Sequence, residues 1–244
     1  NRSNIVSYSP VQFLGEEDAP IVITSSDGSG QGIALLNAKE QSRLEYVLFD
    51  NLASPQKGGY ELSGAVTIYE SSVRIVQSSF RNARAEDMLN IVRSDFSIEN
   101  SSFAKGRSDG IDIDFSKGSI TDSVFADFGG DGIDVSGSAV QVVRIFISSI
   151  KDKGVSVGEG STLQLTDVKI KDCFIAVASK DGSFVDMQQG GVSNCKYGLT
   201  LYQKKPEFSG ATLTASGVTL EQIVVPYLIE SGSAFTLEGT PISS

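Results

Sequence analysis

The sequence predicts an all-β fold: one right-handed parallel β-helix, a solenoid with about 22 residues per coil and three short strands in each coil. The first observation is a repeated phrase, because residues 108–113 (SDGIDI) return as 130–135 (GDGIDV) and, altered, as 152–157 (DKGVSV). Each step is 22 residues. A fixed period of this size is typical of solenoids, in which each repeat packs on its neighbours.

The second observation is that apolar residues recur in three series with nearly the same step. Three series per coil predict three strands per coil, in which alternate side chains point into the core. No segment keeps a period of 3.6, so we expect few helices. Parallel crossovers favour the right hand. The series are Ile75, Ile98, Ile120, Val142, Leu165, Met187; then Phe80, Phe103, Phe125, Ile147, Ile170, Val192; then the pairs Leu89/Ile91, Ile111/Ile113, Ile133/Val135, Val155/Val157, Val177/Ser179, Leu199/Leu201.

The predicted elements follow one another as a single domain, 1–244. Residues 1–43 hold short apolar runs without a regular period, and we expect them to form N-terminal capping coils that cover the open end. Residues 44–206 form the regular coils, with a turn at Gly58-Gly59. Pro206 marks a break, and residues 207–244 form the C-terminal coils.

Composition excludes several classes of function. The chain of 244 residues has a net charge of −10, which disfavours nucleic acid as a partner. It contains no His, which argues against zinc, haem and His-dependent catalysis. We find no nucleotide-binding loop, and no apolar run long enough for membrane insertion. The chain starts at Asn1 without Met, so we expect a mature piece of a larger protein with other domains.

The two cysteines are also one step apart. Cys173 and Cys195 are separated by 22 residues, so on stacked coils they would lie about 5 Å apart. That separation permits a disulfide bond, and two stacked free thiols are the equal alternative.

Acidic side chains repeat on the outward positions of the same strand. If Ile111 and Ile113 point inward, Asp112 and Asp114 point outward, and the next coil adds Asp134. Stacked carboxylates repel one another, by about 3 kcal/mol at an effective dielectric constant near 20. Bound Ca²⁺, a raised pKa or nearby cations would relieve this repulsion. We therefore expect Asp112, Asp134 and Asp114 to be metal ligands if Ca²⁺ is the cofactor.

The turn before this strand carries a further column, Asp87, Asp109, Asp131 and Lys153. Asp-Gly is a common turn, so the three aspartates have a purely structural interpretation as well as a functional one. At the far end of the same face, Lys180, Tyr202 and Lys204 could contact a sugar, or could be ordinary surface residues.

These motifs resemble the pectate-lyase-like superfamily of right-handed parallel β-helices over residues 44–240. Within it, residues 107–110 (RSDG), 129–132 (GGDG) and 152–154 (DKG) are similar to the polygalacturonase signature. The resemblance implies that Asp109, Asp131 and Lys153 stand at catalytic positions of a glycoside hydrolase. The sequence departs from the pattern at Gly130, where the family has a second Asp, and at Lys153, where it has His. The Arg-Ile-Lys segment is absent.

Residues 87–90, 156–159, 179–183 and 202–206 also resemble β-helix modules that accompany spore-coat-type kinase domains in secreted bacterial proteins. Two functions therefore remain open. The first is an extracellular module that binds carbohydrate, Ca²⁺ or both through its acidic face without polygalacturonase activity. The second is an enzyme, a Ca²⁺-dependent lyase or epimerase or a glycoside hydrolase, that acts on acidic polysaccharide. Both imply a secreted protein whose partner is a polysaccharide or cell-surface glycan.

Overall fold

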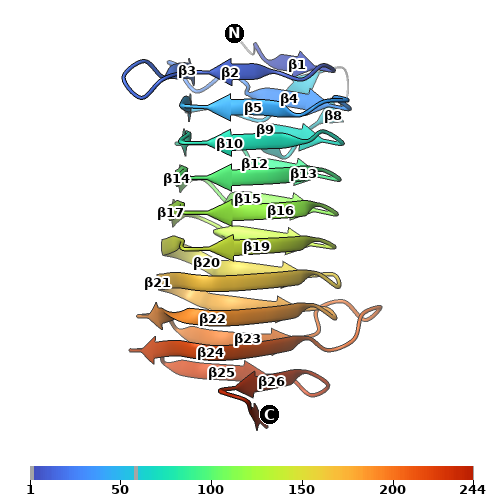
Figure 1. The fold of residues 1–244 in the computed structure, drawn as a ribbon, viewed down its shortest axis with the longest axis vertical. Helices are drawn as coiled ribbons and strands as arrows, with labels where there is room; N and C mark the ends of the chain where they lie inside the picture. The colour runs from blue at the N-terminus through green and yellow to red at the C-terminus, as the bar shows by residue number, and fades with distance from the viewer. Residues whose placement is uncertain (1–2, 58–59, 244) are drawn as a thin grey trace.

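The computed structural model describes residues 3–57 and 60–243, and these residues form one parallel β-solenoid (Figure 1). The termini lie at opposite ends of the stack, and successive coils lie one below the other. The predicted all-β class is confirmed, since the described residues form strands and turns and no helix. The predicted turn at Gly58-Gly59 lies outside the described residues. Nor does the described part of the chain hold any helix that is long and apolar enough to cross a membrane.

Three parallel walls make up the solenoid, and each wall pairs a strand with its equivalent in the next coil. The first wall contains β1 (Ile5–Ser7), β4 (Ile33–Leu36), β9 (Gly64–Tyr69), β12 (Asp87–Val92), β15 (Asp109–Asp114), β18 (Ile133–Ser136), β23 (Tyr197–Tyr202) and β25 (Val225–Ile229). The second wall contains β2 (Gln12–Leu14), β5 (Ser42–Glu45), β10 (Val73–Val76), β13 (Asp95–Glu99), β16 (Lys117–Thr121), β19 (Ala139–Val143) and β26 (Ala234–Leu237). The third wall contains β3 (Ile21–Thr24), β6 (Val47–Asp50), β11 (Ser79–Arg81), β14 (Ser102–Gly106) and β17 (Val124–Phe128).

Later strands continue through the corners, so the three strands of a coil partly merge. These are β20 (Phe146–Gly158), β21 (Thr162–Lys180), β22 (Phe184–Ser193) and β24 (Thr212–Glu221). Antiparallel pairings interrupt the parallel order at several places. β7 (Gln56–Lys57) pairs with β8 (Tyr60–Glu61), β27 (Thr240–Ile242) pairs with β26 at the C-terminal end, and Glu16 forms an antiparallel bridge with Ala19.

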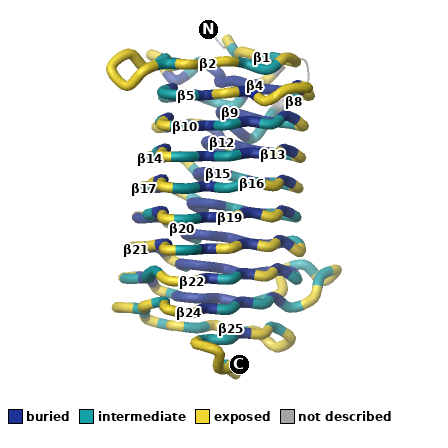
Figure 2. Tube along the Cα trace, viewed as in Figure 1, coloured by how far each residue is buried: buried dark blue, intermediate teal, exposed yellow. Residues whose placement is uncertain are grey.

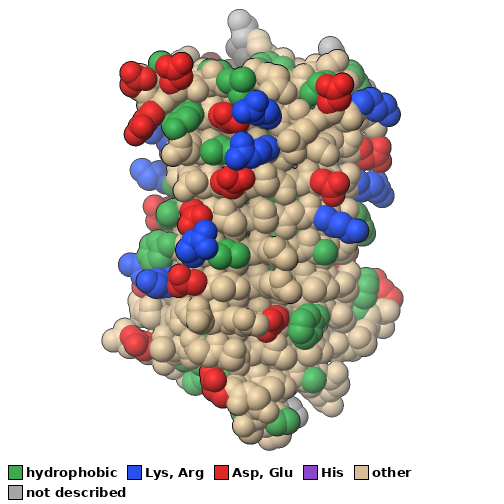
Figure 3. Space-filling view, viewed as in Figure 1, with side chains coloured by type: hydrophobic (Ala, Val, Ile, Leu, Met, Phe, Trp, Pro, Cys, Tyr) green, Lys and Arg blue, Asp and Glu red, His purple; other side chains and the backbone are tan. Residues whose placement is uncertain are grey.

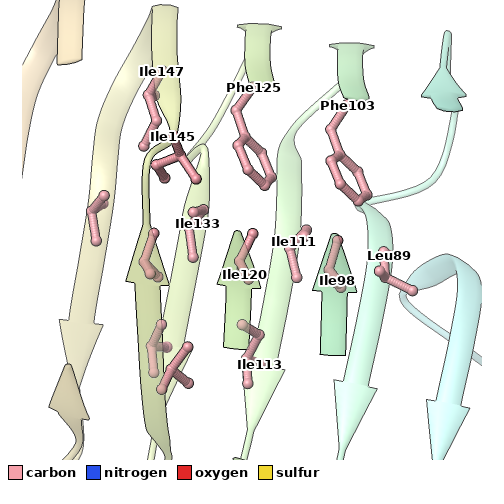
Figure 4. Packing of buried hydrophobic residues seen from close by; sticks show 14 of the residues in the cluster. Leu89, Ile98, Phe103, Ile111, Ile113, Ile120, Phe125, Ile133, Ile145 and Ile147 are labelled. Atoms are coloured by element: carbon pink, nitrogen blue, oxygen red, sulfur yellow. The ribbon is translucent and has the colours of Figure 1, made fainter. Parts of the chain in front are cut away.

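The core lies inside the three walls and consists of the predicted apolar series. Ile98 pairs with Ile120, and Ile111 pairs with Ile133, each at 0% exposure (Figure 4). Figure 2 shows buried residues along the walls and exposed residues concentrated at the corners and the two ends. The predicted stacking of like residues on successive coils is therefore confirmed.

Each corner uses a residue with left-handed backbone, followed at many corners by a buried serine. Between the first and second walls, Arg93 and Phe115 have φ of 47° and 50°. The next residues, Ser94 and Ser116, belong to a ladder in which each hydroxyl accepts the N–H of the equivalent residue one coil earlier. The hydroxyls of Ser94 and Ser116 also donate to the carbonyls two residues before them. The ladder comprises Ser71, Ser94, Ser116, Ser138, Ser161 and Ser183.

Replacing Ser116 by Ala is expected to leave the buried N–H of Ser94 without its partner, which lies 3.0 Å away. The loss should be on the order of 1–3 kcal/mol of unfolding free energy, or a melting temperature lower by roughly 2–10 °C. Thermal unfolding followed by circular dichroism measures it. Ser119→Ala on the same coil, where the half-buried side chain faces outward, is the control and should change little. Equal effects in both variants would contradict the ladder's role.

Candidate functional site

The outward side of the first wall carries a column of polar residues in register. Asn90 pairs with Asp112, Asp112 with Asp134, and Asp134 with Ser156. This is the stacking that the 22-residue step predicts. Asn90 Nδ2 donates to Asp112 Oδ2 at 3.1 Å. We call these four residues the polar column; Asn90 and Ser156 are buried and both aspartates are half-buried.

Crowding of carboxylates shapes the proton affinity of this face. Burial, and then the charges of Asp87, Asp114 and Asp134, raise the pKa of Asp112 to about 9. Burial also raises the pKa of Asp114, although the Asn90 amide opposes that shift. A carboxyl group with a pKa near 9 keeps its proton at neutral pH. Repulsion between the stacked carboxylates could be relieved by bound Ca²⁺, by a raised pKa or by nearby cations. At Asp112 the structure supports the raised pKa.

Asp87 stands at the N-terminal end of the acidic face. It is 2% exposed, and it pairs in register with Asp109 of the next coil. Its Oδ2 atom is buried and has no hydrogen-bond partner among the described residues. Burial raises the pKa of Asp87 to about 7, against the effect of a hydrogen bond from Ser63. From the sequence, Asp87 has both a structural interpretation, as part of a turn, and a functional one.

Asp109 and Asp131 use one carboxylate oxygen each to hold the next coil. Asp109 Oδ1 accepts the backbone N–H of Asp131 at 2.8 Å, and Asp131 Oδ1 accepts that of Lys153 at 2.9 Å. Burial raises the pKa of both carboxyl groups, that of Asp131 to about 6. The structural interpretation of these residues thus has direct support, while their predicted catalytic role stays a prediction.

Gly130 lies where the polygalacturonase pattern has a second Asp, and the structure gives a reason for glycine. A Cβ atom at this position would lie 1.9 Å from Asp109 Oδ1 and 2.8 Å from Ser108 Oγ. Real Cβ atoms do not approach so closely, so a side chain here would displace the Asp109 carboxylate.

Lys153 lies in the same turn column and is a fixed cation. Its Nζ atom is 3.2 Å from Asp131 Oδ1 and 2.6 Å from Asp152 Oδ2. Burial alone would lower the pKa of Lys153, but the two carboxylates outweigh it and raise that pKa above its ordinary value. A lysine held in this way suits charge stabilisation better than proton abstraction.

Lys180 and Tyr202 border the polar column at its C-terminal end, where they are register partners. Lys180 is 8% exposed, and its Nζ donates to Ser156 Oγ at 2.8 Å. Burial raises the pKa of Tyr202; Lys153 opposes the shift, while Asp131 adds to it. The charges of Lys153 and Asp131, in the turn column, thus act on the pKa of the Tyr202 phenol at the other border of the polar column.

Lys204 belongs to a loop that a buried carboxylate holds in place. Asp181 Oδ1 accepts the backbone N–H groups of Lys204 and Lys205 at 2.6 and 2.7 Å. The Lys205 ammonium also pairs with Glu159. Asp181 is not among the candidate residues that the sequence predicts, because only the conformation of this loop brings its carboxylate to the two N–H groups.

The predicted metal set is not assembled as a compact cluster. Within the described ranges, no three His, Cys, Asp or Glu side chains come together in a way that could hold a metal ion. Calcium binding by Asp112, Asp134 and Asp114 therefore stays a prediction. The cysteines are two buried free thiols: Cys195 Sγ accepts the backbone N–H of Cys173 at 3.4 Å, as the serines do elsewhere.

The side of the protein shown in Figure 3 differs from the first wall in its charges. Positive and negative side chains are interspersed on this side. On the second wall, for example, Arg74 contacts both Glu45 and Glu99 on the two neighbouring coils. The polar column with its clustered aspartates is thus the candidate site.

Fold and site together define a solenoid whose first wall carries the polar column over four consecutive coils. The chain belongs to the family of right-handed β-helix regions, whose model matches residues 88–240. The predicted right-handed β-helix is therefore confirmed. No curated protein matches the sequence.

Three solved structures with a similar fold are distant from this chain in sequence. The catalytic domain of Agl-KA is 12% identical, with a TM-score of 0.53 over 96% of this chain and 62% of that one. The pectate lyase Pel9A is 13% identical, with a TM-score of 0.46 over 92% and 64%. The periplasmic alginate epimerase AlgG is 12% identical, with a TM-score of 0.45 over 96% and 77%. This chain spans less than two thirds of the first two, and at such identity the likeness concerns the fold.

Proposed function

We propose that the first wall binds a carbohydrate chain along the polar column and does so without cleaving it. The observation that carries this proposal is the column itself, in which Asn90, Asp112, Asp134 and Ser156 follow one another in register. Coils are about 4.8 Å apart, so a linear polymer along the solenoid axis would meet one hydrogen-bonding group per coil. Such a ligand fits a secreted module of a larger protein.

The protonated state of Asp112 in the polar column suits contact with the hydroxyl groups of a sugar. A protonated Asp112 both donates and accepts hydrogen bonds, as a sugar hydroxyl does. Lys180 and Tyr202 add donors at the C-terminal end of the polar column. Calcium is the other candidate occupant, with Asp112, Asp134 and Asp114 supplying the oxygen ligands that it prefers. Binding measurements with CaCl₂ and with EDTA distinguish binding of a carbohydrate from binding of calcium.

An enzymatic role is the alternative, and three observations weigh against it. The carboxylates of Asp109 and Asp131 each hold a backbone N–H of the next coil. Gly130 supplies no second carboxylate, and a side chain there would displace the carboxylate of Asp109. Lys153 is paired with two aspartates, which keeps its ammonium group protonated. The binding role needs none of these groups to react.

The double variant Asp112→Ala, Asp134→Ala is expected to bind the polymer roughly 5- to 150-fold more weakly than the unchanged protein, because two lost hydrogen bonds at roughly 0.5–1.5 kcal/mol each correspond to that range. Isothermal titration calorimetry with pectate, alginate and α-1,3-glucan, each with CaCl₂ and with EDTA, measures it. Asp172→Ala, an exposed carboxylate at another corner, is the matched control.

The same panel tests the alternative. No binding to any polymer, or equal binding by the double variant and the control, would refute the proposed role of the polar column. Release of reducing ends or of unsaturated product would replace binding by catalysis. Binding that vanishes with EDTA would assign the polar column to calcium.

A further inference from the structure

A polar hollow lies outside the polar column, at the corner between the third and first walls. Its volume is about 1000 Å³. The lining comes from four N-terminal coils and is mainly polar, with hydroxyl, amide and charged groups. Its charged members are Arg84, Arg107 and Glu86, and its hydroxyl groups include those of Ser63 and Ser108.

The two arginines of this hollow differ from most others in the described ranges. Arg43, Arg74, Arg81 and Arg144 each form an ion pair with a carboxylate (2.6, 3.2, 3.1 and 2.7 Å, respectively). Arg93 lies over the ring of Phe115. For Arg84 and Arg107, the described residues provide no carboxylate within ion-pair distance, although Glu86 lines the same hollow.

Arg84 and Arg107 belong to adjacent coils. The backbone N–H of Arg107 donates to the carbonyl of Ala83, the neighbour of Arg84. Both side chains line the hollow, and neither forms an ion pair with a carboxylate of the described residues. In a protein with a net charge of −10, a hollow lined by two arginines and one glutamate is a local site that favours an anion.

Arg84 is held in position before any ligand arrives. Its Nε donates to Asn51 Oδ1 at 2.9 Å. Its guanidinium group lies across Gly28, where a Cβ atom would be 2.3 Å from the guanidinium carbon. Gly28 also has a φ of 72°, which favours glycine. The contact with Asn51 uses one of the five N–H donors of Arg84.

We propose that this hollow binds a sugar acid or sugar sulfate, whose anionic group is attracted by the Arg84 and Arg107 side chains that line the hollow. Guanidinium groups form paired hydrogen bonds with carboxylate and sulfate oxygens. Ser63, Ser108 and Glu86 then face the hydroxyl groups of the ligand. The site stands independently of the polar column, because it shares none of its residues.

Glucuronate and glucose 6-sulfate, tested one by one, are expected to raise the melting temperature and to give a binding isotherm, while glucose gives neither. Titrations at constant ionic strength measure the affinity. Arg84→Gln and Arg107→Gln should each weaken binding at least tenfold and leave the melting temperature without ligand unchanged. Arg144→Gln, which removes a paired arginine on a distant corner, should leave the affinity unchanged.

Equal binding of glucose, or equal affinity in all three arginine variants, would overturn the proposal. Inorganic sulfate is a separate arm, and if it binds as tightly as glucose 6-sulfate, the sugar part of the proposal is wrong. The Asp112→Ala, Asp134→Ala protein should retain glucuronate binding. Polymer binding can therefore fail while this site stands, and the reverse also holds.

Discussion

The variant Phe103→Ala is expected to unfold at a temperature lower by roughly 6–20 °C than the unchanged protein. Phe103 is 0% exposed and stacks between Phe80 and Phe125, with ring centroids 4.7 and 4.8 Å apart (Figure 4). Removing the ring leaves a cavity that rigid coils above and below cannot fill. Such a truncation costs about 3–5 kcal/mol, and each kcal/mol shifts the melting temperature by about 2–4 °C in a domain of this size.

Phe184→Ala is the matched control for this measurement. Phe184 is 39% exposed, so its truncation should cost on the order of 0.5 kcal/mol. Differential scanning calorimetry on both variants gives the comparison. If Phe103→Ala unfolds within about 2 °C of Phe184→Ala, the aromatic stack does not carry the stability assigned to it here.

The stack also illustrates why the fold could be predicted. Phe80, Phe103 and Phe125 recur at nearly constant spacing, and in a parallel solenoid constant spacing means register. Alternation along each strand then separates Ile111 in the core from Asp112 on the surface. Both inferences need only the period and the geometry of a strand. The residues of the core and those of the polar column could therefore both be predicted.

The conformations of the corners, and the hydrogen bonds that depend on them, could not be predicted in this way. Arg93 and Phe115 adopt left-handed backbone conformations. Arg and Phe do not favour this conformation, so the turn cannot be predicted from the residue types. The serine spacing is visible in the sequence, but its hydrogen bonds depend on that turn. Likewise, the contacts of Asp181 depend on a loop that occurs once. The arginine hollow lies among N-terminal coils whose spacing is irregular, where the period gives no register.

Proton binding at Asp112 links the candidate site to stability, and its sign can be worked out. The pKa of this carboxyl is 3.8 when unperturbed and about 9 in the folded chain. Below pH 4 both states are protonated, and the folded state carries no penalty. Between pH 4 and 9 the unfolded chain releases the proton while the folded chain retains it, so stability falls as pH rises. Asp87 and Asp131, with pKa values of about 7 and 6, act in the same direction.

Asp112→Asn is therefore expected to raise the melting temperature at pH 8 by roughly 4–8 °C, on the order of 2 kcal/mol, and to change it little at pH 4. Asparagine is neutral at both pH values and can still accept the hydrogen bond from Asn90. Thermal unfolding in EDTA from pH 4 to 9 measures the slope for both proteins. Asp122→Asn is the opposite control, because Arg144 lowers the pKa of Asp122 and its carboxylate stabilises the fold above that pKa. An unchanged slope in Asp112→Asn would mean that Asp112 is ionised in the folded protein, and calcium would then be the better explanation of the stacked carboxylates.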